Sequence, residues 1–223
     1  MQLRRASWTL AVVLLAGCAA APGGGAGSPV PSGPAALPPG TYVSRAFQPP
    51  VTYAVPAGWW NPSDTGAYFA LQPAGSDLTG IHLFRDPRAA SQDPACPTSP
   101  EPGVGTLSSE LAAWIRGLPG LAVSNPRMVT VGGLRGVEID VAIADGWSVS
   151  CPFANGVPTV PLFVGADSLR WVVAGTERLR LDLLDVPGGG TVVVDVDAFE
   201  GTLWDPLVAA ADPIVKSLDF AAP

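Results

Sequence analysis

The sequence has 223 residues, 12 Lys and Arg, 19 Asp and Glu, and a formal net charge of -7, which suits one domain of ordinary size with extra segments. The few basic residues are scattered, whereas a nucleic-acid-binding protein would gather them in a patch or stripe, so the composition argues against nucleic-acid binding. An acidic domain is also not attracted to anionic lipid head groups.

The first 17 residues predict a signal peptide. A short basic segment that contains Arg4 and Arg5 precedes an apolar run over residues 6–16. This run is too short to cross a bilayer, which takes about 20 residues, and it has the length of the apolar region of a secretory signal.

The end of this segment, Leu15-Ala16-Gly17-Cys18, resembles the lipobox of bacterial lipoproteins. The resemblance implies cleavage before Cys18 and a diacylglyceryl group on the Cys18 thiol. Two acyl chains anchor a protein stably, at about 0.8 kcal/mol per buried CH₂, so we expect the protein at the extracytoplasmic face of the bacterial cell membrane. The alternative is an ordinary secretory signal that is cleaved among the three alanines over residues 19–21.

Residues 19–40 are almost entirely Ala, Gly, Pro and Ser, and none is charged. Such a segment buries too little apolar surface to offset the cost of ordering, which predicts a disordered linker. The chain therefore divides into a signal peptide over 1–17, a lipidated cysteine and linker over 18–40, and a single domain over 41–223. Cleavage removes Arg4 and Arg5, which lowers the net charge from -7 to -9.

Apolar residues that alternate with polar ones predict strands within the domain. These strands are expected around residues 51–55, 68–71, 81–84, 127–131, 137–143 and 169–173. Over residues 107–118 the apolar side chains instead recur with the period of a helix. Thr106 or Ser108 can cap the start of this helix, and Pro119-Gly120 ends it.

The clearest hairpin joins residues 178–186 to residues 191–197 through Pro187-Gly188-Gly189-Gly190. A pairing of Val186 with Thr191 keeps the leucines and valines on one face, and it places Asp182 opposite Asp195 and Arg180 opposite Asp197 on the other.

The last element is a predicted helix over residues 205–218. Asp205-Pro206 is suited to its N-cap and first helical position. Asp212-Pro213 lies inside it and predicts a kink or a division into two shorter helices.

Strands interrupted by two helices predict an α+β domain with a mostly antiparallel sheet and two packed helices, at about 107–118 and 205–218. Three short segments resemble PsbP/Mog1-like domains, and the chain is similar to actinobacterial lipoproteins of the LpqN type. The segments are Val55-Pro56-Ala57-Gly58-Trp59, Val131-Gly132-Gly133-Leu134-Arg135-Gly136 and Val215-Lys216-Ser217-Leu218-Asp219-Phe220. The resemblance implies a sandwich of this type and a role in binding or assembly rather than catalysis, although a fold alone does not determine function.

Cys96 and Cys151 lie in proline-containing loops. Because an exported chain meets an oxidising compartment, we expect a disulfide between them, and the alternative is two free buried thiols. Their spacing supplies no metal-ligand set. The sequence therefore predicts no metal and no cofactor, apart from the lipid on Cys18.

His82 is the only histidine, and any Ser-His-Asp or Cys-His mechanism would have to use it. It lies on a predicted strand and faces away from Ile81 and Leu83. A lone strand histidine is more often a surface or packing residue than a catalytic one.

The predicted hairpin gathers Asp182, Asp195 and Asp197 on one face of the sheet. A solvated, salt-bridged face is one interpretation. A Ca²⁺ site or a pair of hydrolytic carboxylates is the other.

Trp59, Trp60 and Trp147 lie next to Gly and Pro in predicted loops and form a possible binding surface. The alternative for each is a core or loop-pinning role. We therefore expect a non-enzymatic accessory domain that is tethered to the membrane and binds an unknown protein or small molecule. The alternative is a carboxylate-dependent, glycosidase-like surface hydrolase that uses Asp182 and Asp195, and a purely structural role is not distinguished from the first hypothesis.

Overall fold

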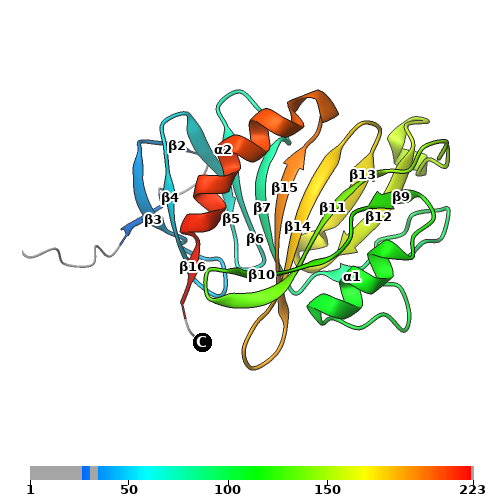
Figure 1. The fold of residues 1–223 in the computed structure, drawn as a ribbon, viewed down its shortest axis with the longest axis horizontal. Helices are drawn as coiled ribbons and strands as arrows, with labels where there is room; N and C mark the ends of the chain where they lie inside the picture. The colour runs from blue at the N-terminus through cyan, green and yellow to red at the C-terminus, as the bar shows by residue number, and fades with distance from the viewer. Residues whose placement is uncertain (1–26, 31–34, 222–223) are drawn as a thin grey trace, which may run out of the picture.

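The computed structural model describes residues 27–30 and 35–221 and arranges them in three layers (Figure 1). The middle layer is a nine-stranded sheet. Its strands are, in spatial order, β10 (Arg127–Val131), β11 (Leu134–Ile143), β14 (Arg178–Asp185), β15 (Thr191–Ala198), β7 (Gly80–Arg85), β6 (Tyr68–Pro73), β5 (Trp59–Asp64) and β2 (Ala35–Leu37), with β9 (Leu121–Val123) also paired to β11.

A smaller sheet and one helix cover each face of the middle sheet. The first outer layer holds β1 (Ser28–Pro29), β3 (Gly40–Val43), β4 (Val51–Val55), β16 (Asp219–Phe220) and α2 (Trp204–Ser217). The second holds β8 (Arg88–Ala89), β12 (Thr159–Val164), β13 (Arg170–Ala174) and α1 (Ser108–Arg116). Short 3₁₀ turns lie at η1 (Pro152–Ala154), η2 (Ala166–Ser168) and η3 (Gly201–Leu203).

Two hydrophobic cores result from this layering, because successive side chains of a strand point to opposite faces of a sheet. On β15, Val192, Val194 and Val196 pack into the first core with α2, whereas Val193 packs into the second core with α1. Every residue of β15 is buried, as expected for a central strand covered on both faces.

The predicted fold class is confirmed. All strand pairs of the middle sheet are antiparallel, and β1 with β3 is the only parallel pair among the described strands. The two helices lie within two residues of their predicted positions.

The predicted register of the β14–β15 hairpin is wrong by one residue. Asp185, rather than Val186, pairs with Thr191, so Asp182 lies opposite Val194 and Asp195 lies opposite Leu181. The turn accommodates one more residue because its three glycines all adopt positive φ angles, between 88° and 114°. A slip of one residue reverses the faces of one strand relative to its partner, so side chains that were expected on the same face lie on opposite faces.

The helix ends also differ from the prediction. Leu107 is the N-cap of α1, and Leu203 is the N-cap of α2, neither with a side-chain cap. Pro213 lies inside α2, which continues to Ser217 instead of dividing into two helices.

Strands also begin before the predicted domain boundary at residue 41. β1 pairs with β3, β2 pairs with β5, and Val30 and Leu37 are buried in the first core. The predicted linker was too long, because these two apolar residues have places in that core. Cys18, the signal peptide and residues 19–26 and 31–34 lie outside the described residues. None of the described helices is long and apolar enough to span a membrane.

Candidate functional site

A disulfide joins the two proline-containing loops, as predicted. Cys96 lies in the loop between β8 and α1, and Cys151 lies in the loop between β11 and β12. The bond closes a sequence separation of 55 residues, for which the chain-entropy model gives a stabilisation of roughly 3–4 kcal/mol. Both loops therefore keep fixed positions over β12.

Trp147 lies in the same loop as Cys151, between β11 and β12, and is held by three contacts. Its indole Nε1–H donates to the Thr159 carbonyl oxygen at 3.3 Å, and its backbone N–H donates to the Ala144 carbonyl oxygen at 3.1 Å. A Cβ atom added at Gly120 would lie 2.6 Å from the Trp147 ring. The absence of a side chain at Gly120 thus allows the indole to pack directly on the backbone.

Trp147 forms one wall of a pocket of about 230 Å³. The rest of its lining is mainly apolar and comes from both disulfide-bonded loops, from the turn between α1 and β9, and from β12. The lining residues are Gln92, Asp93, Pro94, Cys96, Pro119, Gly120, Val149, Thr159, Val160 and Pro161.

The loop that carries Cys96 is fixed to β12 by backbone and amide hydrogen bonds. The side-chain amide of Gln92 donates to the carbonyl oxygens of Ala90 and Pro161, at 3.1 and 2.9 Å. The Ala90 N–H donates to the Leu162 carbonyl oxygen at 2.9 Å. The pocket wall is consequently preformed, as is usual for ligand sites.

The other two predicted tryptophans do not join this site. Trp59 and Trp60 lie on β5 rather than in a loop, and Trp59 is buried in the first core. Figure 1 shows β5 toward one end of the molecule and β12, next to Trp147, toward the other. The predicted aromatic surface therefore reduces to Trp147. The sequence did not reveal that prolines, Gly120 and Gln92 also line the pocket, because contacts between distant parts of the chain bring these residues together.

The predicted pair of carboxylates is separated. Asp182 is paired with Val194, and both point toward the first core. Asp195 is paired with Leu181, and both point toward the second core. Both side chains are buried, with 3% and 0% of their surface exposed. Neither a solvated face nor a shared cleft forms from these two residues, because the one-residue difference in register turns them apart.

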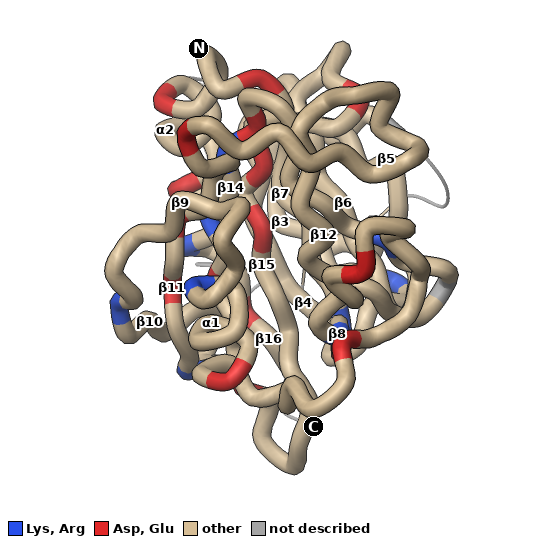
Figure 2. Tube along the Cα trace, turned by 90° about the vertical axis from the view of Figure 1, so that its right-hand side faces the viewer, with Lys and Arg blue, Asp and Glu red and all other residues tan. Residues whose placement is uncertain are grey.

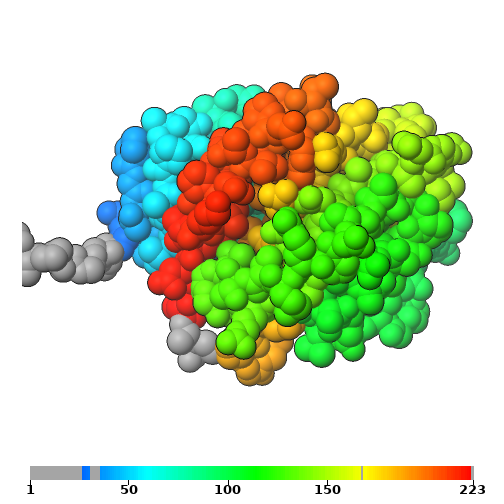
Figure 3. All heavy atoms as spheres, in the orientation of Figure 1, coloured from blue at the N-terminus to red at the C-terminus, as the bar shows by residue number. Residues whose placement is uncertain are grey.

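Asp182 lies at a hollow of about 220 Å³ between the middle sheet and α2. Figure 3 shows this face of the molecule, where α2 passes beside β10 and β11. Arg180 is the central cation there, and its Nε lies 2.9 Å from Asp140 and 3.7 Å from Glu138. Burial raises the pKa of Asp182 to about 6, and the nearby Arg180 opposes this increase.

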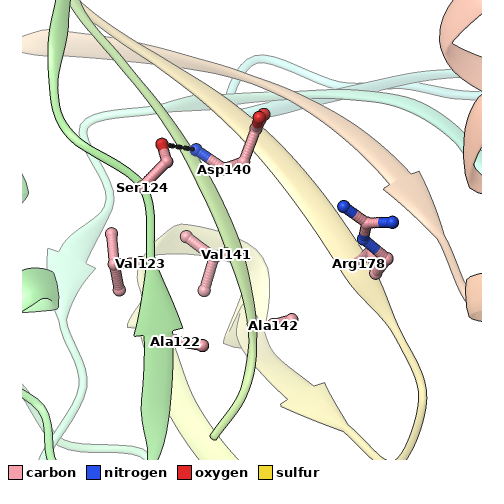
Figure 4. A pocket seen from close by; sticks show the side chains of 7 residues that line it. All are labelled: Ala122, Val123, Ser124, Asp140, Val141, Ala142 and Arg178. Atoms are coloured by element: carbon pink, nitrogen blue, oxygen red, sulfur yellow. Dashed lines mark hydrogen bonds between the residues drawn. The ribbon is translucent and has the colours of Figure 1, made fainter.

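A second hollow, of about 300 Å³, lies along β9 and β11 (Figure 4). Its lining is small side chains, with Asp140 and Arg178 at the side. Arg178 stacks over the Trp204 ring at 4.7 Å, and Asp140 binds Arg180. The charged groups at this hollow are thus already engaged within the protein.

His82 is fully buried and belongs to a polar cluster that faces the second core. Its Nε2 lies 2.8 Å from the Leu78 carbonyl oxygen, and its Nδ1 lies 2.8 Å from the Tyr68 hydroxyl. Because a carbonyl oxygen only accepts hydrogen bonds, Nε2 carries the proton and Nδ1 accepts from Tyr68. Burial lowers the pKa of His82 to about 4, so the ring is neutral near pH 7.

Three buried carboxyls complete this cluster. Asp195 pairs with His82 across the sheet and accepts a hydrogen bond from the Trp171 indole at 2.7 Å. The carboxyls of Asp197 and Glu177 interact with each other, which favours a proton on one of them. Burial, together with the neighbouring carboxyls, raises the pKa values of Asp195 and Asp197 well above the ordinary range, and burial raises that of Glu177 to about 7.

The cluster lacks the features of a catalytic or metal site. Three of its members, His82, Asp195 and Asp197, are almost inaccessible to solvent. Within the part of the chain that the structure describes, no group of three or more His, Cys, Asp or Glu residues is arranged to hold a metal ion.

Comparisons with known proteins give distant structural likeness without a family match. No protein-family model matches the sequence, and no curated protein matches it. The solution structure of cyanobacterial PsbP (CyanoP) from Synechocystis sp. PCC 6803 aligns with 90% of this chain and 100% of its own, with 11% sequence identity and a TM-score of 0.40. At this level of similarity the alignment supports no conclusion about family, ligand or activity.

Proposed function

We propose that this protein is a lipoprotein of the extracytoplasmic membrane surface whose domain binds a partner at the pocket beside Trp147 without catalysing a reaction. The lipobox-like sequence ending at Cys18 supports the location. The pocket supports the binding role, because rigid loops and an aromatic wall reduce the cost of ordering on binding.

The size of the pocket favours a particular kind of ligand. Sites for whole small molecules usually enclose about 300–1,000 Å³, and this pocket encloses about 230 Å³. A single apolar group, such as an aliphatic or proline side chain that projects from a larger partner, fits this space better than a complete drug-sized molecule. The group would pack against the Trp147 ring.

The two carboxylates that the hydrolase alternative needs do not lie close together. A glycosidase places two carboxyl groups on either side of one bond, within about 5–10 Å of each other in an accessible cleft. Asp182 and Asp195 instead lie on opposite faces of the middle sheet, and both are buried.

Photo-cross-linking in cells tests the binding role. A benzoylphenylalanine at Val149, which lines the pocket and is 47% exposed, is expected to capture a discrete partner. The same residue at Met128, which is 80% exposed on β10, serves as the control. Identical products from both positions, or products from position 149 that persist in Trp147→Ala, would refute the proposed site.

Cell fractionation tests the anchor. Cys18→Ala is expected to move the protein from the membrane fraction to the soluble extracytoplasmic fraction, because the acidic domain has no other means of attachment in this proposal. The double variant Cys96→Ala/Cys151→Ala is the matched control and should stay with membranes. A Cys18→Ala protein that remains with membranes would disprove lipid anchoring.

A further inference from the structure

A second apolar surface lies where α2 begins, away from the Trp147 pocket. Three of the eight large apolar side chains that are exposed in the described residues gather there: Leu78, Phe199 and Leu203. Two hollows, of about 220 and 370 Å³, adjoin Leu203 and share Ser76 and Thr79 in their linings. We name this surface the Phe199 groove and define it by Ser76, Leu78, Thr79, Phe199, Leu203, Pro206, Leu207 and Ala210.

The loops that form the Phe199 groove are held by specific contacts. The Phe199 N–H donates to the Thr79 hydroxyl at 3.2 Å, which ties the end of β15 to the loop before β7. The buried His82 ring donates to the Leu78 carbonyl oxygen from beneath. At Gly201, an added Cβ would lie 2.5 Å from the Thr176 carbonyl oxygen, so η3 packs closely on the neighbouring turn. The exposed apolar side chains therefore belong to an ordered surface.

The edge of the Phe199 groove is acidic. Asp77 and Glu200 line one hollow, and Asp205 follows Leu203 in the first turn of α2. All three are exposed, and none forms an ion pair with another described residue. Arg178, which pairs with Ala198 at the end of β15, stacks on the Trp204 ring. Figure 2 shows Asp and Glu positions, in red, at the end of the molecule where α2 begins.

We infer that the Phe199 groove is a docking surface for a basic amphipathic segment of another protein. Apolar side chains at helical spacing would enter the two hollows on either side of Leu203, as in other helix-in-groove complexes. Lys or Arg residues flanking these anchors would face Asp77, Glu200 and Asp205. Their attraction would guide the encounter and fix the orientation of the segment.

Charge separates this occupant from the two obvious alternatives. An anionic membrane surface would be repelled by the three acids at the edge. A second copy of this chain, which carries a net charge of -7, offers little positive charge in return. A basic segment is the partner that satisfies both the apolar floor and the acidic edge.

Binding of a synthetic peptide tests the inference. The full chain, captured on a sensor through a C-terminal tag, is exposed to a helical peptide of Leu on one face and Lys on the other, and to a matched Leu and Glu peptide. We expect the Lys peptide to bind about tenfold more tightly or better. Phe199→Ser should weaken its binding about tenfold, as for a central apolar anchor. The double variant Asp77→Lys/Glu200→Lys should also weaken the binding of the Lys peptide, although it leaves the apolar side chains of the groove unchanged.

Matched controls distinguish docking from general attraction. Met128→Ser removes an apolar side chain that is 80% exposed on β10, and Asp219→Lys reverses an exposed acid beyond the far end of α2. Both should leave peptide binding unchanged. Three results would each overturn the inference: equal affinity for the two peptides, binding that survives the Phe199 and charge variants, or self-association or binding of phosphatidylglycerol vesicles that Phe199→Ser abolishes.

Discussion

At the scale of single residues, Gly120 determines the position of the pocket wall. A Cβ atom there would lie 2.6 Å from both the Trp147 ring and Val160. Gly120→Ala should therefore displace the indole and lower the free energy of unfolding by about 1–3 kcal/mol, the usual cost of overpacking. Urea denaturation measures this change.

Gly66→Ala is the control for this prediction, because nothing lies within 4 Å of a Cβ at Gly66. Equal stability of the two variants would mean that the Trp147 wall yields without cost. In that case the pocket would not be the rigid feature that its contacts indicate.

The protonation state of His82 is a second prediction at this scale. The Leu78 carbonyl and the Tyr68 hydroxyl select the neutral tautomer with the proton on Nε2. Long-range ¹H–¹⁵N spectra of this single histidine should show that tautomer, unchanged from neutral pH to about pH 5, because burial lowers its pKa to about 4. A titration centred near the ordinary value of 6.5 would show that the ring is hydrated instead.

Residue types alone did not reveal the environments of these groups. The sequence correctly placed His82 on a strand and paired Cys96 with Cys151. It did not predict that Asp195 and Asp197 are buried, because an acidic residue on a strand is normally expected at the surface. The burial follows from the layer formed by β12 and β13, and β12 lacks the simple alternation by which a strand is recognised.

At the scale of secondary-structure elements, the start of α1 depends on a residue from a distant strand. The carboxylate of Asp185, at the end of β14, accepts hydrogen bonds from the Ser108 N–H at 2.8 Å and from the Ser108 hydroxyl at 2.7 Å. A negative group at this position also interacts favourably with the helix dipole. The local prediction of a Thr106 or Ser108 cap could not include this contact.

Asp185→Ala should lower the free energy of unfolding by about 1–2 kcal/mol, as the loss of a helix cap does. Asp185→Asn retains an acceptor and should cost less. Asp145→Ala removes an exposed acid from another loop and serves as the control in the same chemical-denaturation experiment. Equal effects of Asp185→Ala and Asp145→Ala would show that the cap contributes nothing to α1.

The hairpin shows why strand positions were easier to predict than strand pairing. Alternation of apolar residues located β14 and β15 correctly. It favoured the register that pairs apolar with apolar residues, whereas the observed register sets Leu181 opposite Asp195 and Asp182 opposite Val194. Contacts with Asp86, in the bend that follows β7, favour the observed register. The Asp86 carboxylate accepts a hydrogen bond from the Thr191 N–H at 2.9 Å, and the Asp86 N–H donates to the Thr191 carbonyl oxygen at 2.8 Å.

At the scale of the whole molecule, the buried carboxyls make stability depend on pH. A carboxyl whose pKa is raised by folding binds its proton more tightly in the folded state, so stability falls as pH rises from the unfolded pKa to the folded pKa. For Glu177 this window runs from 4.5 to about 7, and for Asp182 from 3.8 to about 6. Asp195 and Asp197 act in the same direction.

His82 acts in the opposite direction. Its pKa is lowered from 6.5 to about 4, so the stability that it contributes is lost as pH falls through that range. Each proton changes the free energy of unfolding by about 1.4 kcal/mol per pH unit, and four carboxyls oppose one imidazole. The carboxyls therefore determine the sign, and the protein should be more stable at about pH 5.5 than at about pH 7.5.

Urea denaturation at a series of pH values measures this dependence. Glu177→Gln should raise the free energy of unfolding near pH 7.5 by up to about 3 kcal/mol, because the neutral amide removes the charge that burial disfavours. It should also flatten the pH profile. Glu200→Gln, an exposed glutamate at the nearby surface, should leave both unchanged. If the free energy of unfolding instead falls as the solution is acidified from neutral pH, the cluster of Glu177, Asp195 and Asp197 is hydrated rather than buried beneath β13.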